Sequence, residues 1–413
     1  MAEIYKCSVE RMKDKIETFA KFGDTGHGGI TRFSLSPEAL AARAEWKRRC
    51  EALGMKVYSD DMANLYAVLE GSDPSLPAIY SGSHCDSVRQ GGNYDGILGV
   101  LSALEVAETI VKEKISHKHN YICMIWTNEE GADYEPAMMS SGVVCGKFDK
   151  EKMLASRSHS TGKTFGEALA ASGYVGSEAN RIGPAKCGAL LELHIEQGPV
   201  LEAEKKDIGV VEGVCGMINY EFTFVGQADH AGTTPMKYRK DALYAACKVI
   251  RYLHDEFDKL DPKLVYTTGK ISCHPNIHTI IPDLVRFTLD ARHQDPKVIE
   301  QCIAVIKKIP AEVEKCKFSY AEAWSRATVS FHKPYVDFVE QSAEALGYTS
   351  MRMYSGPGHD AQFAAELVPT TMIFVPSEGG HSHCELEYTP VENCKKGADV
   401  LLNTVLKIDG AME

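Results

Sequence analysis

The sequence predicts an α/β fold into which a second, α+β domain is inserted. Strand-like and helix-like segments alternate along most of the chain, which is the pattern of an α/β domain. Between about residues 212 and 326 the order becomes strand, helix, strand, strand, helix, strand, which is typical of a ferredoxin-like unit. A chain of 413 residues is long enough for two or three domains, at roughly 150 residues each. We place a first domain at 1–211 and 327–413 and the inserted domain at 212–326.

Periodicity indicates where the helices and the core strands lie. Apolar residues recur every three or four positions in the predicted helices 37–53, 96–115, 241–260, 297–314, 335–346 and 395–406. Short aliphatic segments predict core strands at 64–69, 78–83, 121–127, 190–194 and 371–375. Each of the last four strands ends in or shortly before a candidate site residue, so we expect one site at the strand ends of an open α/β sheet.

The inserted domain contains none of the candidate metal ligands named below. Its predicted elements are the strands 218–225, 264–272, 284–291 and 317–324 and the helices 241–260 and 297–314. We expect this domain to cover the site or to pair subunits.

Composition excludes several classes of function. The net charge of −12 and the absence of a basic cluster argue against nucleic-acid binding. The N-terminus is too polar for a signal peptide, and no window approaches the roughly 18 to 20 apolar residues that span a bilayer. The 13 cysteines include no CxxC pair, so we expect thiols in a reducing compartment. A cytoplasmic protein is therefore predicted.

Five segments each place a His, Asp or Glu among small or turn residues: SGSHCDSV, GGNYDG, WTNEEG, LELHIEQGP and GGHSHCELE. This mixture of imidazole and carboxylate suits a borderline divalent ion such as Zn²⁺ or Mn²⁺. The pattern predicts a two-metal hydrolase. The candidate ligands are His84, Asp95, Glu130, His194 and His383.

Three of these segments also indicate roles for single residues. Asp86 lies two residues after His84, where it can accept the second imidazole N–H and fix the tautomer that binds metal. Asp95 ends a Gly-rich loop just before a predicted helix, so it can bridge two cations, cap the helix, or do both. Of the last two histidines, His381 and His383, the spacing alone does not choose one as a ligand.

Taken in order, six blocks resemble those of the M20 metallopeptidase superfamily: GSHCDSVRQGGNYDGILGV, TNEEG, LELHIEQGPVLE, HAGTTPMKYRKDA, SGPGHDA and GHSHCELE. The resemblance covers nearly the whole chain and points to the amidase branch, which comprises N-carbamoyl-L-amino-acid hydrolases, β-ureidopropionases and allantoate amidohydrolases. It implies an α/β, di-metal M20-type catalytic domain with an inserted ferredoxin-like lid or dimerisation domain.

The resemblance also implies a metal centre. Two divalent ions per subunit (zinc, manganese, cobalt or nickel) would share Asp95, one with His84 and His194 and the other with Glu130 and His383. The resemblance thus selects His383 over His381.

The resemblance further assigns the catalytic residues. Glu129 would be the general base that activates water. We count Asp86, for its expected contact with His84, among the candidate catalytic residues. His230, in the inserted domain, resembles a donor that stabilises an oxyanion in the site of a partner subunit, which implies a homodimer.

Substrate contacts are implied at Gln197, His230, Arg292 and Gly358. Arg292 would hold a substrate carboxylate in a fork that Lys cannot reproduce.

Three positions depart from the pattern of the branch. Thr279 stands where an Asn is usual, so a substrate hydrogen bond is altered or supplied by Asn276 or His278. Asp133 stands where an Arg is usual, which would suit a substrate with a neutral or positive distal group. Glu385 stands where a Pro is common.

The expected activity is hydrolysis of a linear ureido C–N bond in a small carboxylate substrate, such as an N-carbamoyl-L-amino acid or N-carbamoyl-β-alanine. The alternatives are an allantoate amidohydrolase, a dipeptidase or aminoacylase of the same superfamily, and a non-catalytic binding protein on this fold. The last should lack Glu129 or a ligand, and none is missing. A serine hydrolase is disfavoured because no GxSxG elbow is found.

Overall fold

The computed structural model describes residues 3–412, and the chain divides into two units. Unit 1 comprises Met1–Gly213 and Ser330–Glu413, and unit 2 comprises Val214–Val329. Among the described residues, no helix has the length and apolarity needed to cross a membrane. All thirteen cysteines are free thiols, as the sequence predicted.

Unit 1 is built on a mixed sheet of nine strands within the described residues, in the order β1-β2-β4-β3-β5-β15-β6-β13, with β14 paired to β6. Because β3 pairs in parallel with β4 and β5, and β5 pairs in parallel with β15, these four strands end at the same edge of the sheet. The strands are β1 (Lys56–Ser59), β2 (Leu65–Leu69), β3 (Ala78–His84), β4 (Tyr121–Trp126), β5 (Cys187–Ile195), β6 (Ile208–Val214), β13 (Val329–Ser330), β14 (Ser350–Ser355) and β15 (Thr370–Val375).

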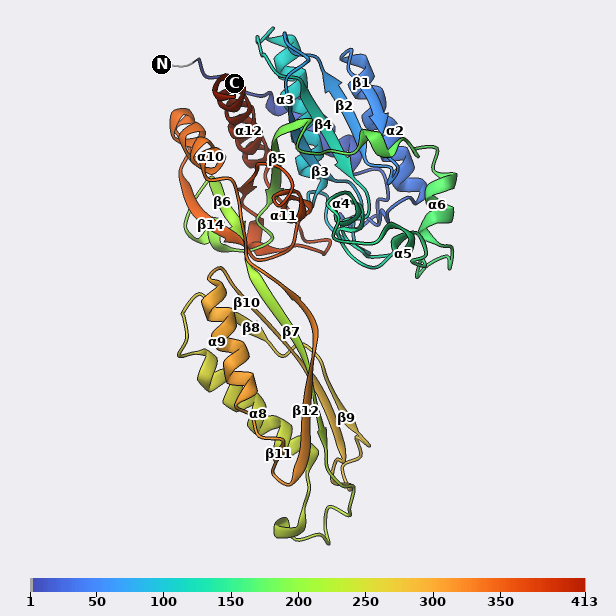
Figure 1. Cartoon of the computed structure of the whole chain (residues 1–413), viewed down its shortest axis with the longest axis vertical. Coiled ribbons are helices and arrows are strands. Elements are labelled where there is room, and N and C mark those ends of the chain that lie inside the picture. The colour runs from blue at the N-terminus through green and yellow to red at the C-terminus, as the bar shows by residue number, and fades with distance from the viewer. Residues whose placement is uncertain (1–2, 413) are drawn as a thin grey trace. The chain divides into compact units, whose positions relative to one another are not determined.

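The helices of unit 1 pack on this sheet. α3 and α12 contact each other and the central strands, and α10 packs against α12 (Figure 1). α1 packs against both α3 and α12. All six residues of β4 are buried, as expected of a core strand that is covered on both faces. The helices are α1 (Val9–Phe19), α2 (Pro37–Ala52), α3 (Ile97–Lys112), α4 (Met139–Val144), α5 (Lys150–Leu154), α6 (Phe165–Ala171), α7 (Val200–Ala203), α10 (Lys333–Leu346), α11 (Asp360–Ala364) and α12 (Val391–Ala411), with short 3₁₀ turns η1 (Glu178–Asn180) and η3 (Glu378–Gly380).

Unit 2 is an antiparallel sheet with helices on one face. Its order is β11-β12-β7-β10-β8, with β9 also paired to β10. Alternate residues of β7 and β10, including Phe222, Phe224 and Phe287, form an apolar core with α8 and α9. The elements are β7 (Gly216–Val225), η2 (Met236–Tyr238), α8 (Ala242–Phe257), β8 (Val265–Thr267), β9 (Ile271–His274), β10 (Leu284–His293), α9 (Pro296–Lys307), β11 (Glu312–Val313) and β12 (Cys316–Arg326).

Two of the predicted elements of the inserted domain differ from the structure. The single strand predicted at 264–272 is wrong, because β8 and β9 pair separately with β10. Between Thr267 and Ile271 the chain has one residue more than the facing part of β10, so the ladder is interrupted as at a bulge. The helix predicted at 297–314 ends at Lys307, because Pro310 cannot continue it, and the chain then enters β11.

The helix α1 was not predicted, and a buried ion-pair network attaches it to α3. Glu105 is fully buried and lies 2.6 Å from Arg11 Nη2 and 2.7 Å from Lys15 Nζ. Its Oε1 also accepts a hydrogen bond from the Ser8 backbone N–H at 3.0 Å. One carboxylate on α3 therefore satisfies two cations of α1.

We expect Glu105→Ala to destabilise the protein by about 3–5 kcal/mol, because breaking a buried ion pair is strongly destabilising. The buried Lys15 would keep only Glu108 as a partner. The free energy of unfolding in urea measures this loss. Glu17→Ala removes a carboxylate from the solvent-exposed side of α1 and should change stability by less than about 0.5 kcal/mol. Equal effects of the two substitutions would contradict the assigned role of Glu105.

Candidate metal centre

The strand ends of unit 1 bring the predicted ligands together. His84 is the last residue of β3, Glu129 and Glu130 follow β4, and His194 lies near the end of β5. Asp95 precedes α3 by two residues, and His383 lies in the segment between β15 and α12. This is the carboxyl edge at which the sequence placed the site.

The ligands form two clusters that share Asp95. In the first, Asp95 Oδ1 lies 3.3 Å from His84 Nε2 and 3.4 Å from His194 Nε2. In the second, His383 Nε2 lies 3.5 Å from Asp95 Oδ2 and 3.4 Å from Glu130 Oε2. The ligand atoms within each cluster lie within 4.8 Å of one another. Asp95 thus directs one oxygen to each cluster.

The histidine tautomers suit metal binding in the first cluster. His84 Nδ1 lies 3.0 Å from the Asp86 carbonyl oxygen, and His194 Nδ1 lies 2.9 Å from the Ile195 carbonyl oxygen. Each Nδ1–H therefore donates to its carbonyl, and Nε2 is the ring atom that faces Asp95.

The structure corrects the expected contact of Asp86. Its backbone carbonyl, rather than its carboxylate, accepts from His84, because the carboxylate oxygen lies 3.8 Å from Nδ1. The carboxylate instead accepts from the backbone N–H groups of Glu129 at 3.4 Å and Glu130 at 3.2 Å. Asp86 thus positions the two acidic residues that follow β4.

Gly96 leaves the space that the first cluster needs. Its φ is +62°, and a Cβ there would lie 2.3 Å from His84 Nε2 and Cε1. Its N–H points at His194 Nε2, 3.0 Å away. Only glycine combines this backbone conformation with so close an imidazole.

The second cluster contains a buried polar atom without a protein partner. Glu130 Oε1 is buried and has no hydrogen-bond partner among the described residues. Burial, with the charge of Asp95, raises the pKa of Glu130 to about 8, and the hydrogen bond with Asp95 raises the pKa of His383 to about 9. Burial would raise the pKa of Asp95 as well, but the neighbouring histidines hold it well below its usual value. A divalent cation would satisfy these groups, so the residues fit such ions.

A further group, Glu192 with His194 and His359, also has ligand-like spacing. The Glu192 carboxylate already accepts from the Ser83 hydroxyl at 2.6 Å and from the Ala361 N–H at 3.1 Å. Through these contacts Glu192 has a structural role, because it joins β5 to β3 and α11.

Glu129 lies beside the first cluster. Its Oε2 is 3.7 Å from His84 Nε2, and the residue is buried. Burial raises the pKa of Glu129 well above its ordinary value, while the charge of His84 opposes the shift. The preceding Asn128 has a φ of +60° and donates through Nδ2 to the Tyr134 carbonyl at 2.8 Å. The turn after β4 is thus held in a conformation that non-glycine residues rarely adopt.

Gln197 and Gly358 also lie in unit 1. Gln197 Nε2 donates to Asp95 Oδ2 at 2.6 Å and lies 3.3 Å from His383 Nε2, so this side chain borders the second cluster. Gly358 precedes His359, whose ring packs edge-on against that of His194 with 4.6 Å between centroids.

His230, in unit 2, is held as a hydrogen-bond donor. The N–H groups of Gly232 and Thr233 donate to its Nδ1 at 3.0 and 3.2 Å, so the ring proton lies on Nε2. The Ala231 N–H donates to the Thr279 carbonyl at 2.9 Å, which places the exposed turn with Asn276 and Thr279 next to His230.

Arg292 lies at the other end of the same sheet. It is near the end of β10, with Nε donating to Asp290 Oδ1 at 2.8 Å. His230 pairs with Ile280, beyond the start of β10 at Leu284. Eight residues separate Leu284 from Arg292, which corresponds to about 27 Å at about 3.4 Å per residue. Within unit 2, therefore, His230 and Arg292 do not meet.

Two departures from the resemblance have local explanations. Asp133 is buried, and its carboxylate accepts from the Ser158 hydroxyl at 2.6 Å and the Ser160 N–H at 2.8 Å. These bonds stabilise a turn, and the expected influence of Asp133 on a distal substrate group stays a prediction. Glu385 accepts from the Thr25 hydroxyl at 2.6 Å and so links two loops.

Sequence reasoning missed three polar residues near the clusters. Glu387 and Ser382 contact Asp95, and Asp360 accepts a hydrogen bond from the Ser141 hydroxyl. Glu387 lies in the block GHSHCELE four residues after His383, and Asp360 lies in SGPGHDA. Their positions in these blocks were the available signal, but their hydrogen bonds depend on tertiary contacts that spacing does not encode.

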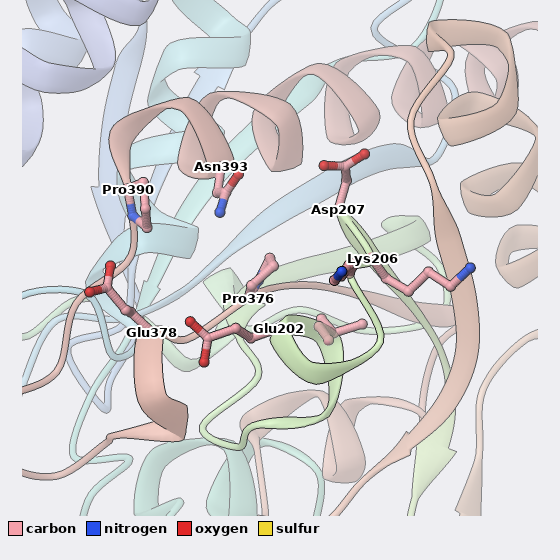
Figure 2. A pocket seen from close by; sticks show the side chains of 9 residues that line it. Glu202, Lys206, Asp207, Pro376, Glu378, Pro390 and Asn393 are labelled. Carbon is pink, nitrogen blue, oxygen red and sulfur yellow. The ribbon is translucent and has the colours of Figure 1, made fainter.

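A pocket of about 280 Å³ lies elsewhere in unit 1. Figure 2 shows Glu202, Glu378 and Asn393 among the side chains around it. None of the predicted site residues lines it. Glu202 accepts from the Gly379 N–H at 2.9 Å, so this region supports the start of the segment that carries His383.

Comparison with known proteins identifies the family. The model of peptidase family M20/M25/M40 matches residues 81–407, so the chain belongs to this family. An N-carbamoyl-L-amino-acid amidohydrolase from Rhizobium meliloti is 37% identical over 408 residues, covering 97% of each chain. An allantoate amidohydrolase from Bacillus subtilis is 32% identical, covering 98% of this chain and 99% of that one.

A solved structure agrees with these relatives. An amidase of the hydantoinase/carbamoylase family from Burkholderia multivorans has a TM-score of 0.92 at 38% identity, with 98% of each chain covered. The chain is thus a hydrolase of the amidase branch, as the sequence predicted.

We expect Gly96→Ala to weaken metal binding by about 10- to 100-fold, the range seen when groups that orient metal ligands are changed. Zinc content after dialysis against metal buffers measures this. Gly54→Ala is the matched control, because Gly54 also has a positive φ but nothing lies within 4 Å of its Cβ position. Wild-type metal affinity in Gly96→Ala would show that His84 does not need this space.

Proposed function

We propose that the protein hydrolyses a linear ureido C–N bond in a small carboxylate substrate, such as an N-carbamoyl-L-amino acid, with two divalent ions per subunit. The observation that carries this proposal is the sharing of Asp95 between two ligand clusters, one oxygen facing each. The N-carbamoyl-L-amino-acid and allantoate amidohydrolases among the relatives support the ureido substrate class.

The metal roles follow from the clusters. His84, Asp95 and His194 would hold one ion, and Asp95, Glu130 and His383 the other. When bound, such ions polarise the ureido carbonyl and lower the pKa of water.

Glu129 moves the proton. In this proposal its carboxylate takes a proton from the attacking water and delivers it to the nitrogen of the departing amine, so the residue is regenerated. Burial raises its pKa, which makes it a stronger base than an exposed carboxylate. The C–N bond breaks, and the carbamate that leaves decomposes to CO₂ and NH₃.

The inserted domain would complete the site by dimerisation. His230 Nε2 can donate to an oxyanion, and Arg292 can bind the substrate carboxylate. A small substrate cannot touch both residues of one subunit across roughly 27 Å of strand. We therefore propose a homodimer in which Arg292 of one subunit acts with His230 of the partner subunit.

Exposed apolar groups on unit 2 support this dimer. Met236, Tyr238 and Ile277 are exposed beside His230. The strand β12 carries exposed Trp324, and beyond its start it pairs with a described strand only on its β7 side. An exposed edge strand of this kind is suited to pairing with a second copy.

Ammonia release tests the proposed reaction. Protein loaded with Zn²⁺ or Mn²⁺ is assayed against N-carbamoyl amino acids, N-carbamoyl-β-alanine, allantoate and dipeptides, with a chelated control. Metal-dependent ammonia from a ureido compound supports the proposal and selects the substrate. Release of amino acids from dipeptides without ammonia would contradict it and indicate a peptidase.

Glu129→Gln should lower kcat by about 10²- to 10⁴-fold while both metals stay bound, because the amide cannot accept the proton. Metal content and kcat are measured on the same sample. Glu204→Gln, in an exposed part of unit 1, should leave kcat unchanged. A metal-loaded Glu129→Gln protein with near-normal kcat would remove Glu129 from the role of base.

Mixing two inactive variants tests the shared site. His230→Ala and Arg292→Ala homodimers, mixed equally and allowed to exchange subunits, should recover about a quarter of wild-type activity, because half the dimers are mixed and each mixed dimer has one intact site. His230→Ala protein mixed with the double variant His230→Ala/Arg292→Ala should recover no activity, because no dimer then has an intact site. A first mixture that stays inactive after proven exchange would contradict the shared site.

A further inference from the structure

One buried carboxylate joins the two loops that carry ligands of the second cluster. Glu387 Oε1 accepts from the N–H groups of Tyr94 and Asp95 at 2.9 and 3.0 Å. Its Oε2 accepts from the Ser382 hydroxyl at 3.0 Å and lies 3.4 Å from the His383 N–H. One side chain therefore contacts the backbone of both Asp95 and His383.

The chain leaves room for this carboxylate. A Cβ on Gly92 would lie 2.1 Å from Glu387 Oε1, so any larger residue at position 92 would displace it. Glu387 is also buried, at 3% exposure, and four donors point at its two oxygens. A carboxylate that accepts several hydrogen bonds in a buried site holds its donors firmly.

Ser382 extends the connection to the ligand itself. Its hydroxyl lies 3.0 Å from both Asp95 Oδ2 and Glu387 Oε2. A single hydroxyl proton can serve one of these carboxylates at a time. Glu387 thus contacts the backbone N–H of Asp95, and Ser382 contacts its side-chain carboxylate.

His383 is the ligand that most needs such support. The other ligands end strands, follow a strand directly, or precede a helix, but His383 lies in a loop with a φ of +56° and a side chain that is 49% exposed. A non-glycine residue in this conformation persists only when its surroundings hold it. Glu387 supplies that restraint through the His383 backbone.

We propose that Glu387 is a positioning residue that fixes the distance between Asp95 and His383, and thereby the affinity of the second metal cluster. The proposal rests on the two-metal function proposed above and goes beyond it, because Glu387 is not one of the expected ligands. Its contacts with Ser382 and the His383 N–H concern the second cluster alone, whereas its contact with Asp95 concerns the ligand that both clusters share. The first cluster should therefore depend on Glu387 less than the second.

Metal binding tests this proposal without an activity assay. Zinc bound per chain is measured over a series of zinc buffers for the wild type, Glu387→Gln and Gly92→Ala. We expect the wild type to bind two ions. In both variants the affinity of the weaker site should fall by about 10- to 100-fold, while the affinity of the tighter site is retained. Glu387→Asp keeps the charge but is one methylene shorter, so it should restore little of the lost affinity.

Glu378→Gln is the matched control, because it removes a charge from an exposed residue of the same segment. It should bind both ions as the wild type does. Two ions bound with wild-type affinity by folded Glu387→Gln would overturn the positioning role alone. If Glu387→Gln does not fold, the same result in Gly92→Ala would overturn it. A wild type that binds no divalent ion would overturn the proposed function and this inference together.

Discussion

The position of Asp95 is the constraint on which the metal centre depends. Its two oxygens face two clusters only because β3 and β5, which pair in parallel, bring His84 and His194 to the same edge of the sheet. Gly96 then allows the chain to turn into α3 close to the His84 ring, because a Cβ at this position would lie 2.3 Å from that ring. The first cluster therefore belongs to the core of the sheet, whereas the second is completed by a loop.

This difference in rigidity has a chemical consequence. His84 and His194 have their Nδ1 atoms fixed by backbone carbonyls, so their tautomers are set before any ion arrives. His383 has its backbone held through Glu387 and its ring half exposed. A centre with one preformed cluster and one loop-dependent cluster would fill its two sites with different affinities. In unit 2, by contrast, the long β10 separates His230 from Arg292. The proposed homodimer would bring these two residues, one from each subunit, to one substrate site.

Much of the fold could be predicted because its signals are local. The buried strands β3, β4, β5 and β15 are short segments rich in apolar residues, and each ends in or is followed by polar residues, so their common edge was predictable. The break between β8 and β9 was not predictable, because one extra residue is visible only against the register of β10. The helix predicted to reach residue 314 ignored Pro310, which was a readable signal.

The candidate site shows the same division. Four of its five candidate ligands could be named from short motifs, and the fifth, His383, was chosen over His381 only by the family resemblance. The contact of the Asp86 carbonyl rather than its carboxylate depends on how the chain turns after β3. Glu387 connects two ligand loops and Asp133 stabilises a turn, and neither set of contacts could be predicted from the sequence. Hydrogen bonds between segments almost three hundred residues apart, such as Asp95 and Glu387, leave no trace in local spacing.

The central claim is that two divalent ions share Asp95. A crystal structure of zinc-loaded protein, with anomalous difference maps at the zinc absorption edge, tests it most directly. The account predicts two peaks, one between His84 and His194 and one between Glu130 and His383, with Asp95 contacting both. A single peak, or a peak between Glu192 and His359, would contradict it.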